Sequence, residues 1–545
     1  MDLQVIGVAG AALGGASHLG YFIDGEHHKN GPKYVISALT IPAFLFLGFV
    51  RTLGQNAIVE AARATSVAVL SYAGALFLSM AIYRVFFHRL RNFPGPLPLK
   101  VTKFAHLYNL MKEEHGPRDF EFRDKLHKEF GEFVRIGPNE LSISAPESLV
   151  KILGPGSKCS KGEYYDDIAV GSVSLHYVRS KELHGLRRKI WDRAFNSKAL
   201  RGYEGRMLKY ADQLMEQFRS HKGKPINAAD WFAFYSFDIM GDMAFGAPYD
   251  MLLDGKPNPM ATIVQQGSVI LGPLGPIPWL LPILNAIPGA AKSIKVWVRS
   301  NISKYEPESP DLFTYLLEAE KIGSHPIHKD PKWLVGDSTL VIGAGTDTTT
   351  ITFSYLFYYL CRYPEIQEKV YQELKEYYHP GTEAEFRDLA NAPYLNGVIM
   401  EVLRLNPPVP GGILRKTPSE GITVGDTFIP GGVTVSAPLW TVGRLESCYE
   451  KPTEFIPERW SSKPEMIRNK NAFASFSLGP MACVGRQFAM MELRNLTSRI
   501  LSEFKVNFAP GEDGHAIMHE WHESFTMHVD SLMLQFKQRD EVFAN

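Results

Sequence analysis

The sequence predicts a mainly helical globular body that follows a set of N-terminal membrane helices. Two observations lead to this prediction. Three apolar stretches lie within the first ninety residues, and an unbroken run of apolar or small residues, 333–362, lies in the body. A strand has only about 5–6 residues. A run of this length therefore indicates a long buried helix.

The composition is that of a globular protein, and its charge and its cysteines argue against several classes of partner and cofactor. The chain has 545 residues, of which 45% are hydrophobic, and its 58 Lys and Arg balance its 58 Asp and Glu. A general nucleic-acid binder needs a basic excess, so no nucleic acid is expected as a partner. The cysteines are far apart and contain no C-x-x-C pair, which excludes a disulfide framework and a zinc ribbon. They are Cys159, Cys361, Cys448 and Cys483.

Residues 1–92 are predicted to be a membrane anchor with up to three transmembrane segments. The clearest is 65–87, whose first nineteen residues carry no charge, close to the roughly 20 that span a bilayer. The basic residues at and after its end place the chain that follows in the cytoplasm. The other candidates are 34–50, which contains Pro42, and 3–23. A signal peptide is the alternative for 3–23, but a basic start is missing.

The stretch "FPGPLPL" separates this anchor from the body. Prolines at positions 94, 96 and 98 predict a stiff, extended hinge. The globular body is therefore expected to comprise residues 93–545.

The segment "STLVIGAGTDTTTITF", residues 338–353, has two possible interpretations. A dinucleotide turn requires G-x-G-x-x-G, but Thr348 stands where the third glycine should be. The long apolar run that ends before Pro364 favours a helix instead. Asp347 and Thr348 then lie in the middle of a buried helix, which is costly for an unpartnered acid. The polar centre is either a water-filled notch or a groove where a ligand meets an acid and a hydroxyl.

A single cysteine carries the strongest signal. In "FSLGPMACVGRQFAMMELR", residues 476–494, the positions Phe476, Gly479, Cys483 and Gly485 form F-x-x-G-x-x-x-C-x-G before an amphipathic helix. Glycines let a backbone wrap closely around a bulky group, and the start of a helix stabilises a thiolate. Such a thiolate is a good axial ligand for haem iron. The alternative is an inert buried cysteine.

Together these motifs make residues 93–545 resemble a cytochrome P450. "AGTDTT", residues 344–349, resembles the oxygen-activating stretch of the family's central helix. "EVLR", residues 401–404, resembles the family's E-x-x-R motif. "PERW", residues 457–460, resembles the segment that contains the family's second arginine. The resemblance implies the P450 fold, mainly α with small β-sheets. It also implies a buried structural triad of Glu401, Arg404 and Arg459. A second E-x-x-R, Glu60 to Arg63, lies in the anchor and is a chance match.

The resemblance also implies a cofactor, haem b, with Cys483 as the axial ligand of its iron. The expected neighbours of the haem are Phe476, Gly479, Gly485, Ala344 and Gly345. His184 and Arg188, four residues apart on a predicted helix, and Arg415 are expected to bind the propionates. Many family members carry a basic residue two positions before the cysteine, where this chain has Met481. His184, Arg188 and Arg415 must then provide more of the binding of the propionates.

The implied function is that of a haem-thiolate monooxygenase of the endoplasmic reticulum membrane, with the catalytic domain facing the cytoplasm. It would take electrons from NADPH–cytochrome P450 reductase, activate O2, and hydroxylate a mid-sized hydrophobic substrate, with Asp347 and Thr348 delivering protons. The anchor and cysteine loop resemble fungal enzymes of secondary metabolism. Oxidative coupling, desaturation, epoxidation and rearrangement are alternatives. A non-catalytic haem protein is a distant one, because it would not need the acid and hydroxyl.

Two further groups of residues follow from the resemblance. The apolar, proline-broken segment 270–289 resembles the loop between the family's lid helices, where it either contacts membrane lipid or forms a buried connector. Apolar pocket walls are expected in four places: 170–177, 340–344, 410–413 and 525–527.

Overall fold

The structure is a computed structural model. It describes residues 2–54, 56–112, 118–169, 172–246, 248–259, 261–263, 271–284, 298, 300, 305, 310–322, 325–378, 384–520, 522–529 and 531–540.

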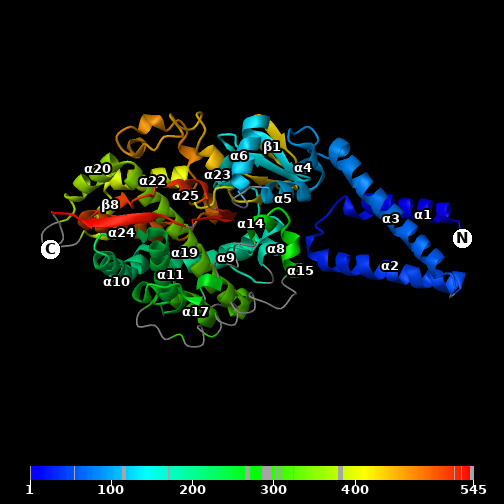
Figure 1. The fold of residues 1–545 in the computed structure, drawn as a ribbon, viewed down its shortest axis with the longest axis horizontal. Coiled ribbons are helices and arrows are strands. Elements are labelled where there is room, and N and C mark those ends of the chain that lie inside the picture. Colours follow the sequence, from blue (N-terminus) through cyan, green and yellow to red (C-terminus); the bar gives the residue numbers. More distant parts are fainter. Residues whose placement is uncertain are drawn as a thin grey trace.

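Three long helices form the N-terminal part and stand away from the body, at the right of Figure 1. Among the described residues, three spans are long and apolar enough to cross a membrane: Leu3–Phe22, His28–Leu53 and Ile58–Phe87. They comprise α1 (Leu3–Ser17) with a π-helical turn (His18–Phe22), α2 (Gly31–Leu53) after a 3-10 turn (His28–Asn30), and α3 (Ile58–Ile82) with a π-helical turn (Tyr83–Phe87). The predicted segment 34–50 was too short, because α2 continues through polar residues at both ends.

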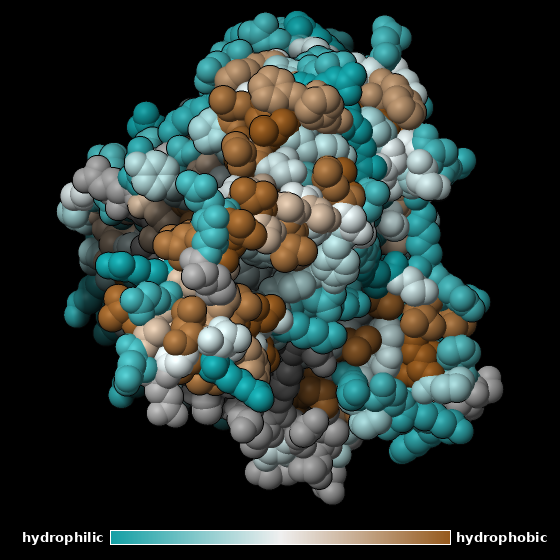
Figure 2. Space-filling model, turned by 90° about the vertical axis from the view of Figure 1, so that its right-hand side faces the viewer, coloured by the Kyte–Doolittle hydropathy of each residue, from teal (hydrophilic) through white to brown (hydrophobic). Residues whose placement is uncertain are grey.

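Helices α1 and α3 pack closely because α1 carries glycines where the two backbones meet. A Cβ atom on Gly10 would lie 2.7 Å from the carbonyl oxygen of Ala68, and one on Gly14 would lie 2.2 Å from that of Tyr72. Small residues allow this approach between membrane helices. Large apolar side chains such as Phe44 remain exposed. Viewed from the anchor end, apolar residues crowd the middle of the face (Figure 2).

The segment after the anchor differs from the extended hinge that its prolines predict. The N–H of Arg135 donates to the carbonyl of Pro94 at 2.7 Å. Gly95 has a φ of 144°, and a Cβ there would lie 2.4 Å from the carbonyl oxygen of Arg135. Helix α4 (Leu97–Val101) follows at once. The segment is therefore fixed on strand β1 (Phe133–Gly137), because the proline carbonyls are free to accept the strand's N–H groups.

The body is mostly helical, as predicted. Around the long helix α19 lie α5 (Lys103–Met111), α6 (Asp119–Phe130), α7 (Ser148–Leu153), α8 (Tyr164–Ala169), α9 (Lys181–Ala194), α10 (Ser197–Ser220), α11 (Ala228–Phe245), α12 (Met251–Asp254), α14 (Leu271–Leu274), α15 (Leu281–Leu284), α17 (Leu312–Ile322), α18 (Pro326–Lys329), α20 (Pro364–Leu374), α21 (Phe386–Leu389), α22 (Pro393–Leu405), α23 (Leu439–Val442), α24 (Arg486–Glu503) and α25 (His515–His519).

The sheets are small, as expected. One has four strands in the order β1-β2-β7-β4, another has the order β3-β11-β8, and β5-β6 and β9-β10 are two-stranded. Their bounds are β2 (Glu140–Ile143), β3 (Ile226–Asn227), β4 (Arg415–Lys416), β5 (Ile422–Val424), β6 (Thr427–Ile429), β7 (Thr434–Ser436), β8 (Phe504–Phe508), β9 (His522–Ser524), β10 (Thr526–His528) and β11 (Met533–Gln538).

Helix α19 (Pro331–Arg362) crosses the body beside α11 and α9 (Figure 1). It begins two residues before the predicted run, because the side chain of Asp330 accepts the N–H of Lys332 as an N-terminal cap. It is helical throughout and ends before Pro364. The polar centre does not break it, since the hydroxyl of Thr348 donates to the carbonyl of Ala344 at 2.7 Å without replacing the helical ladder.

The lid segment 270–289 is described only at 271–284. There α14, the 3-10 turn Pro278–Leu280 and α15 form short pieces, which agrees with the prolines. Residue 270 and residues 285–289 lie outside the described residues.

Candidate active site

The cysteine loop forms a closed turn ahead of α24. The N–H of Cys483 donates to the carbonyl of Phe476 at 2.8 Å, and the hydroxyl of Ser475 donates to the carbonyl of Leu403 at 2.6 Å, which attaches the loop to α22. Gly479 has a φ of 68°, and a Cβ there would lie 2.6 Å from the carbonyl oxygen of Leu153. Only glycine fits at this position.

The Cys483 side chain is the exposed one among the four cysteines, all of which are free thiols. Burial nevertheless raises the pKa of Cys483, while the backbone N–H groups of Gly485 and Arg486 and the charges of Arg188 and Arg486 lower it. A sulfur that is both accessible and surrounded by protein lies in a recess. N–H groups at the start of α24 point at it and favour the thiolate, but burial outweighs them and the pKa of the thiol stays above its ordinary value.

One face of α19 is open in the middle of an otherwise buried helix. Ala344 is exposed and Thr348 is half-buried, and nothing lies within 4 Å of a Cβ built on Gly343. Gly345 lies on a different side from the one expected. A Cβ on it would lie 2.2 Å from the sulfur of Met240. The absence of a side chain at Gly345 thus allows close packing of α19 on α11. The open face is formed by the residues next to Gly345 in the helix.

Asp347 is a half-buried acid with no ion pair or hydrogen bond to any other described residue. Burial raises its pKa to about 7. At neutral pH the carboxyl group is therefore close to equally protonated and ionised. An acid with this pKa both releases and takes up protons near physiological pH.

A buried group of cations lies beside the site. His184 and Arg415 are 6% and 4% exposed. Lys161, which is not part of any recognised motif, is 4% exposed. Burial and the charge of Arg415 lower the pKa of Lys161 to about 7, and burial with the neighbouring charges lowers that of His184 to about 4. No described carboxylate forms an ion pair with any of the three. At neutral pH Arg415 is charged, Lys161 is about half protonated and His184 is neutral. An anion bound here would favour the protonated form of each group.

The partners of these cations are mostly oxygen atoms with no charge. Arg415 donates to the Tyr165 hydroxyl at 2.9 Å, and Lys161 donates to the carbonyl of Leu175 at 2.9 Å. Arg188 differs, because it forms an ion pair with Asp192 at 2.7 Å and donates to the carbonyl of Ala482, next to Cys483, at 2.6 Å. Arg188 therefore links α9 to the cysteine loop.

Glu401, Arg404 and Arg459 lie in contact and are almost completely buried. Arg404 donates to both carboxylate oxygens of Glu401 at 2.7 and 2.8 Å, and the Nε of Arg459 donates at 2.9 Å. Trp460 also donates to Glu401, at 2.8 Å. The guanidinium groups bond carbonyls of the 443–454 segment as well. One carboxylate thus joins α22 to the segments that precede the cysteine loop.

The pocket segments are only partly described. Residues 170 and 171 of the segment 170–177 lie outside the described residues. His176 packs its ring against Phe525 with centroids 5.7 Å apart. Phe525 occupies the turn between β9 and β10 with a φ of 79°, which is a strained conformation for a bulky residue.

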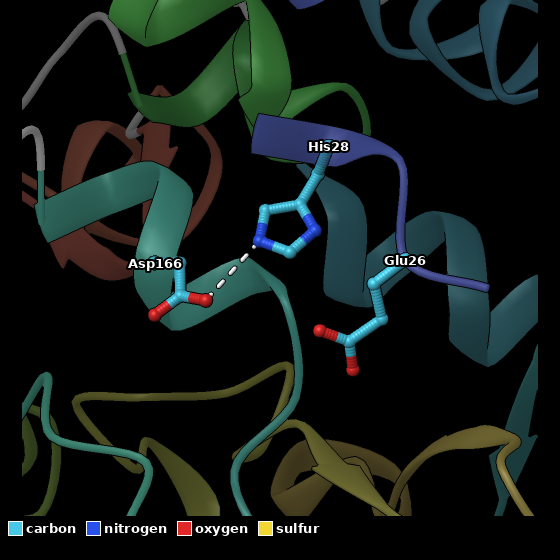
Figure 3. Close-up of side chains that lie close together, drawn as sticks. All are labelled: Glu26, His28 and Asp166. Carbon is cyan, nitrogen blue, oxygen red and sulfur yellow. Dashed lines mark hydrogen bonds and ion pairs between the residues drawn. The ribbon is translucent and has the colours of Figure 1, made fainter. Parts of the chain in front are cut away.

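A second polar cluster has the spacing of a metal site but lies elsewhere. Glu26 and His28, from the connection between α1 and α2, face Asp166 of α8 (Figure 3). Arg179 donates to both oxygens of Glu26 at 2.7 and 2.9 Å and to Asp166 at 2.7 Å. Lys29 also pairs with Asp166, and Lys416 with Glu26. The cations already neutralise both acids, so the cluster joins the anchor to the body by ion pairs.

These residues fit an iron porphyrin. The recess provides one accessible cysteine sulfur, the cation group provides partners for carboxylates, and the open face of α19 is bare of large side chains. Fold and site therefore describe a mainly helical protein whose cysteine recess suits a haem.

Comparison with known proteins identifies the family. The family model described as Cytochrome P450 matches residues 98–536. The chain is 36% identical over 540 residues to "Tryprostatin B 6-hydroxylase" of Aspergillus fumigatus, covering 97% of this chain and 95% of the relative. It is 35% identical over 549 residues to "Cytochrome P450 monooxygenase notG'" of Aspergillus versicolor, covering 98% and 97%. It is 37% identical over 476 residues to "Cytochrome P450 monooxygenase FCK2" of Fusarium pseudograminearum, covering 86% of each.

The chain belongs to the cytochrome P450 family. It is an oxidoreductase of the monooxygenase type, which implies haem, O2, a substrate and a redox partner. The relatives named above are fungal enzymes, and the three N-terminal helices agree with a membrane-anchored member of the family.

Proposed function

We propose that Cys483 ligates the iron of haem b and that the enzyme hydroxylates a mid-sized hydrophobic molecule in fungal secondary metabolism. The observation that carries this proposal is the accessible sulfur of Cys483 in its recess, with backbone N–H groups directed at it. Haem supplies the activation of O2 when it is bound. The name of one relative, a hydroxylase, supports hydroxylation over the alternative oxidations.

Each residue of the site then has a defined task. Cys483 holds the metal, while His184, Arg188, Arg415 and the newly found Lys161 bind the propionates. Ala344 leaves room on the distal side, and Phe476, Gly479 and Gly485 shape the loop. The triad of Glu401, Arg404 and Arg459 fixes the loop's supporting segments.

Asp347 and Thr348 are proposed to move protons at the site. Thr348→Ala removes a hydroxyl on the open face of α19, so NADPH consumption should continue while product formation falls about 10- to 100-fold. Peroxide should take the place of product. The measurement is the amount of product and of peroxide formed for each NADPH consumed, with reductase and a turned-over substrate present.

Thr352→Ala is the matched control, because the Thr352 hydroxyl makes the same kind of bond, to the carbonyl of Thr348 at 2.7 Å, but faces the core. This variant should keep the wild-type coupling, which is the amount of product formed for each NADPH consumed. Asp347 adds a pH test. Its carboxyl is protonated below about pH 7, so coupling should fall as pH rises through 7, and Asp347→Asn should remove that pH dependence. Full coupling in Thr348→Ala would contradict the assignment.

The electron donor is proposed to be NADPH–cytochrome P450 reductase. Two cations act on Cys483, the half-buried Arg188 of α9 and the exposed Arg486 of α24, and Arg188 joins α9 to the cysteine loop through Ala482. A basic surface near the metal suits an acidic electron-transfer partner.

Residues 1–92 are proposed to anchor the body, residues 93–545, in the endoplasmic reticulum membrane with the body in the cytoplasm. The ion pairs of Glu26, His28 and Lys29 hold the α1–α2 connection against the body (Figure 3). Gly31, at the start of α2, lies against Trp279 and Ile283 of the lid segment. This contact supports a lid segment that faces membrane lipid. The α1–α2 connection then lies on the cytoplasmic side, with the body. Because α1 crosses the membrane once before this connection, the N-terminus lies in the lumen.

This arrangement predicts the topology of the anchor. An epitope added before Asp2 should be protected from protease in sealed microsomes, while the catalytic body is digested. Detergent should remove the protection. Digestion of the epitope in sealed microsomes would contradict an odd number of crossings, and an internal microsomal protein serves as the control for sealing.

The proposed activity is tested by turnover. The full-length protein, reductase and NADPH are incubated in membranes with a panel of hydrophobic fungal metabolites, and products are identified by mass. A product heavier by one oxygen supports hydroxylation or epoxidation, and NMR of the isolated product separates an alcohol from an epoxide. Coupled dimers or a loss of two hydrogens would favour the alternative reactions.

A further inference from the structure

We propose that Asp337 positions the pocket loop, residues 172–177, and so controls the size of ligand that the site accepts. Asp337 touches neither the proposed haem nor a substrate, so it is a positioning residue. The inference rests on the proposed placement of haem at Cys483.

The Asp337 carboxylate is a completely buried junction of three elements. On α19 it is 0% exposed. One oxygen accepts from the Nε of Arg187 at 2.6 Å and from the indole of Trp191 at 3.1 Å, both on α9. The other oxygen accepts the backbone N–H of Leu175, in the pocket loop, at 2.8 Å. Both oxygens are therefore occupied, and the loop is held by the oxygen that α9 leaves free.

The neighbouring glycine brings the loop onto α19. A Cβ on Gly336 would lie 1.9 Å from the carbonyl oxygen of Val173, so the loop backbone rests directly on the helix. Lys161 holds the loop from the other side, with bonds to the carbonyls of Leu175 and His176 at 2.9 and 2.7 Å. The loop has one position that satisfies all of these contacts.

The position of Asp337 relates the loop to the open face of α19. Residues seven apart lie on nearly the same face of a helix and about 10 Å apart along it. Asp337 and Ala344 are related in this way. The loop that Asp337 holds thus stands beside the open face, and it carries His176, whose ring meets Phe525. Moving the loop moves one wall of the pocket while Cys483 stays in place.

A buried ion pair is weak support for stability, because desolvation offsets much of its attraction. The hydrogen bond from the Leu175 N–H to the Asp337 carboxylate is directional, so it still holds the loop in one geometry. Loss of the Asp337 charge leaves Arg187 buried without a counter-charge, which costs stability in the body as a whole, and it weakens the contacts that position the loop. The loop should therefore loosen while the haem site, which Asp337 does not touch, keeps its geometry.

Two azoles of different size measure this effect in the full-length enzyme. Imidazole is a small ligand of the iron, and clotrimazole is a bulky one that also fills the pocket. In Asp337→Asn, the carbon monoxide spectrum and imidazole affinity should match the wild type, while clotrimazole affinity should fall about tenfold through lost preorganisation. Asp330→Asn, at the half-buried cap of the same helix, is the control and should change neither affinity.

The other outcomes overturn the inference. Unchanged clotrimazole binding means that Asp337 does not position the loop, and equal weakening of both azoles means that it acts on the haem site. If Asp337→Asn does not fold, the double variant Arg187→Met with Asp337→Leu replaces the pair without an unpaired charge, and the same azole criteria apply to it. A wild-type enzyme without a thiolate-type carbon monoxide spectrum would instead refute the proposed function.

Discussion

Replacing Cys483 with serine is expected to abolish the thiolate-type carbon monoxide spectrum and all detectable turnover. A serine hydroxyl stays protonated at neutral pH, so it cannot provide the anionic sulfur that a thiolate-ligated haem requires. No described residue provides a substitute, because the other three cysteines are buried. The measurement is the difference spectrum of the reduced protein with and without carbon monoxide.

Cys361→Ser is the control for this change. Cys361 lies near the end of the same central helix α19, and burial raises the pKa of its thiol to well above neutrality. The variant should keep the spectrum of the wild type. If Cys483→Ser kept it as well, another residue would be the iron ligand.

Glu401→Gln should have the second largest effect, a loss of stability of about 3–5 kcal/mol. Glutamine has nearly the same shape, but it leaves Arg404 and Arg459 buried without a counter-charge. Since domains are stable by only about 5–15 kcal/mol, most of the protein should lose its haem or fail to fold. The measurement is the haem content and the unfolding midpoint of the purified protein.

Glu454→Gln provides a matched control in the same region. Its carboxylate pairs with Lys451 at 3.5 Å, and both side chains are 57% exposed. An exposed pair contributes about 0–1 kcal/mol, so this variant should behave as the wild type does. Equal stability of Glu401→Gln and wild type would show that the triad is not a structural support.

Much of the fold could be predicted from the sequence because long periodic or apolar runs have one physical solution. The helix at 333–362 and the anchor segment 65–87 are examples, since neither a strand nor a loop can bury that many apolar residues. The hinge could not be predicted correctly. Proline carbonyls fit a free connector and the edge of a strand equally well, and only tertiary contact with Arg135 decides between them.

The site shows the same limit. The cysteine loop was recognisable because its glycines and its cysteine stand in one local pattern. Lys161 and Asp337 were not, because their partners, Leu175 and Arg187, are distant in the sequence or are backbone groups. The sequence predicts Gly345 as a neighbour of the haem, but the side of the helix on which its Cα hydrogen lies faces Met240 of α11. Local motifs identify the residue types of a site, but the direction in which each residue points depends on packing against parts of the chain that are distant in the sequence.

The central claim is that Cys483 is the axial thiolate of a haem. Its most direct test is the difference spectrum of the reduced full-length protein with carbon monoxide. We expect a strongly red-shifted Soret band. A band typical of histidine-ligated haem, or folded protein without haem, would contradict it.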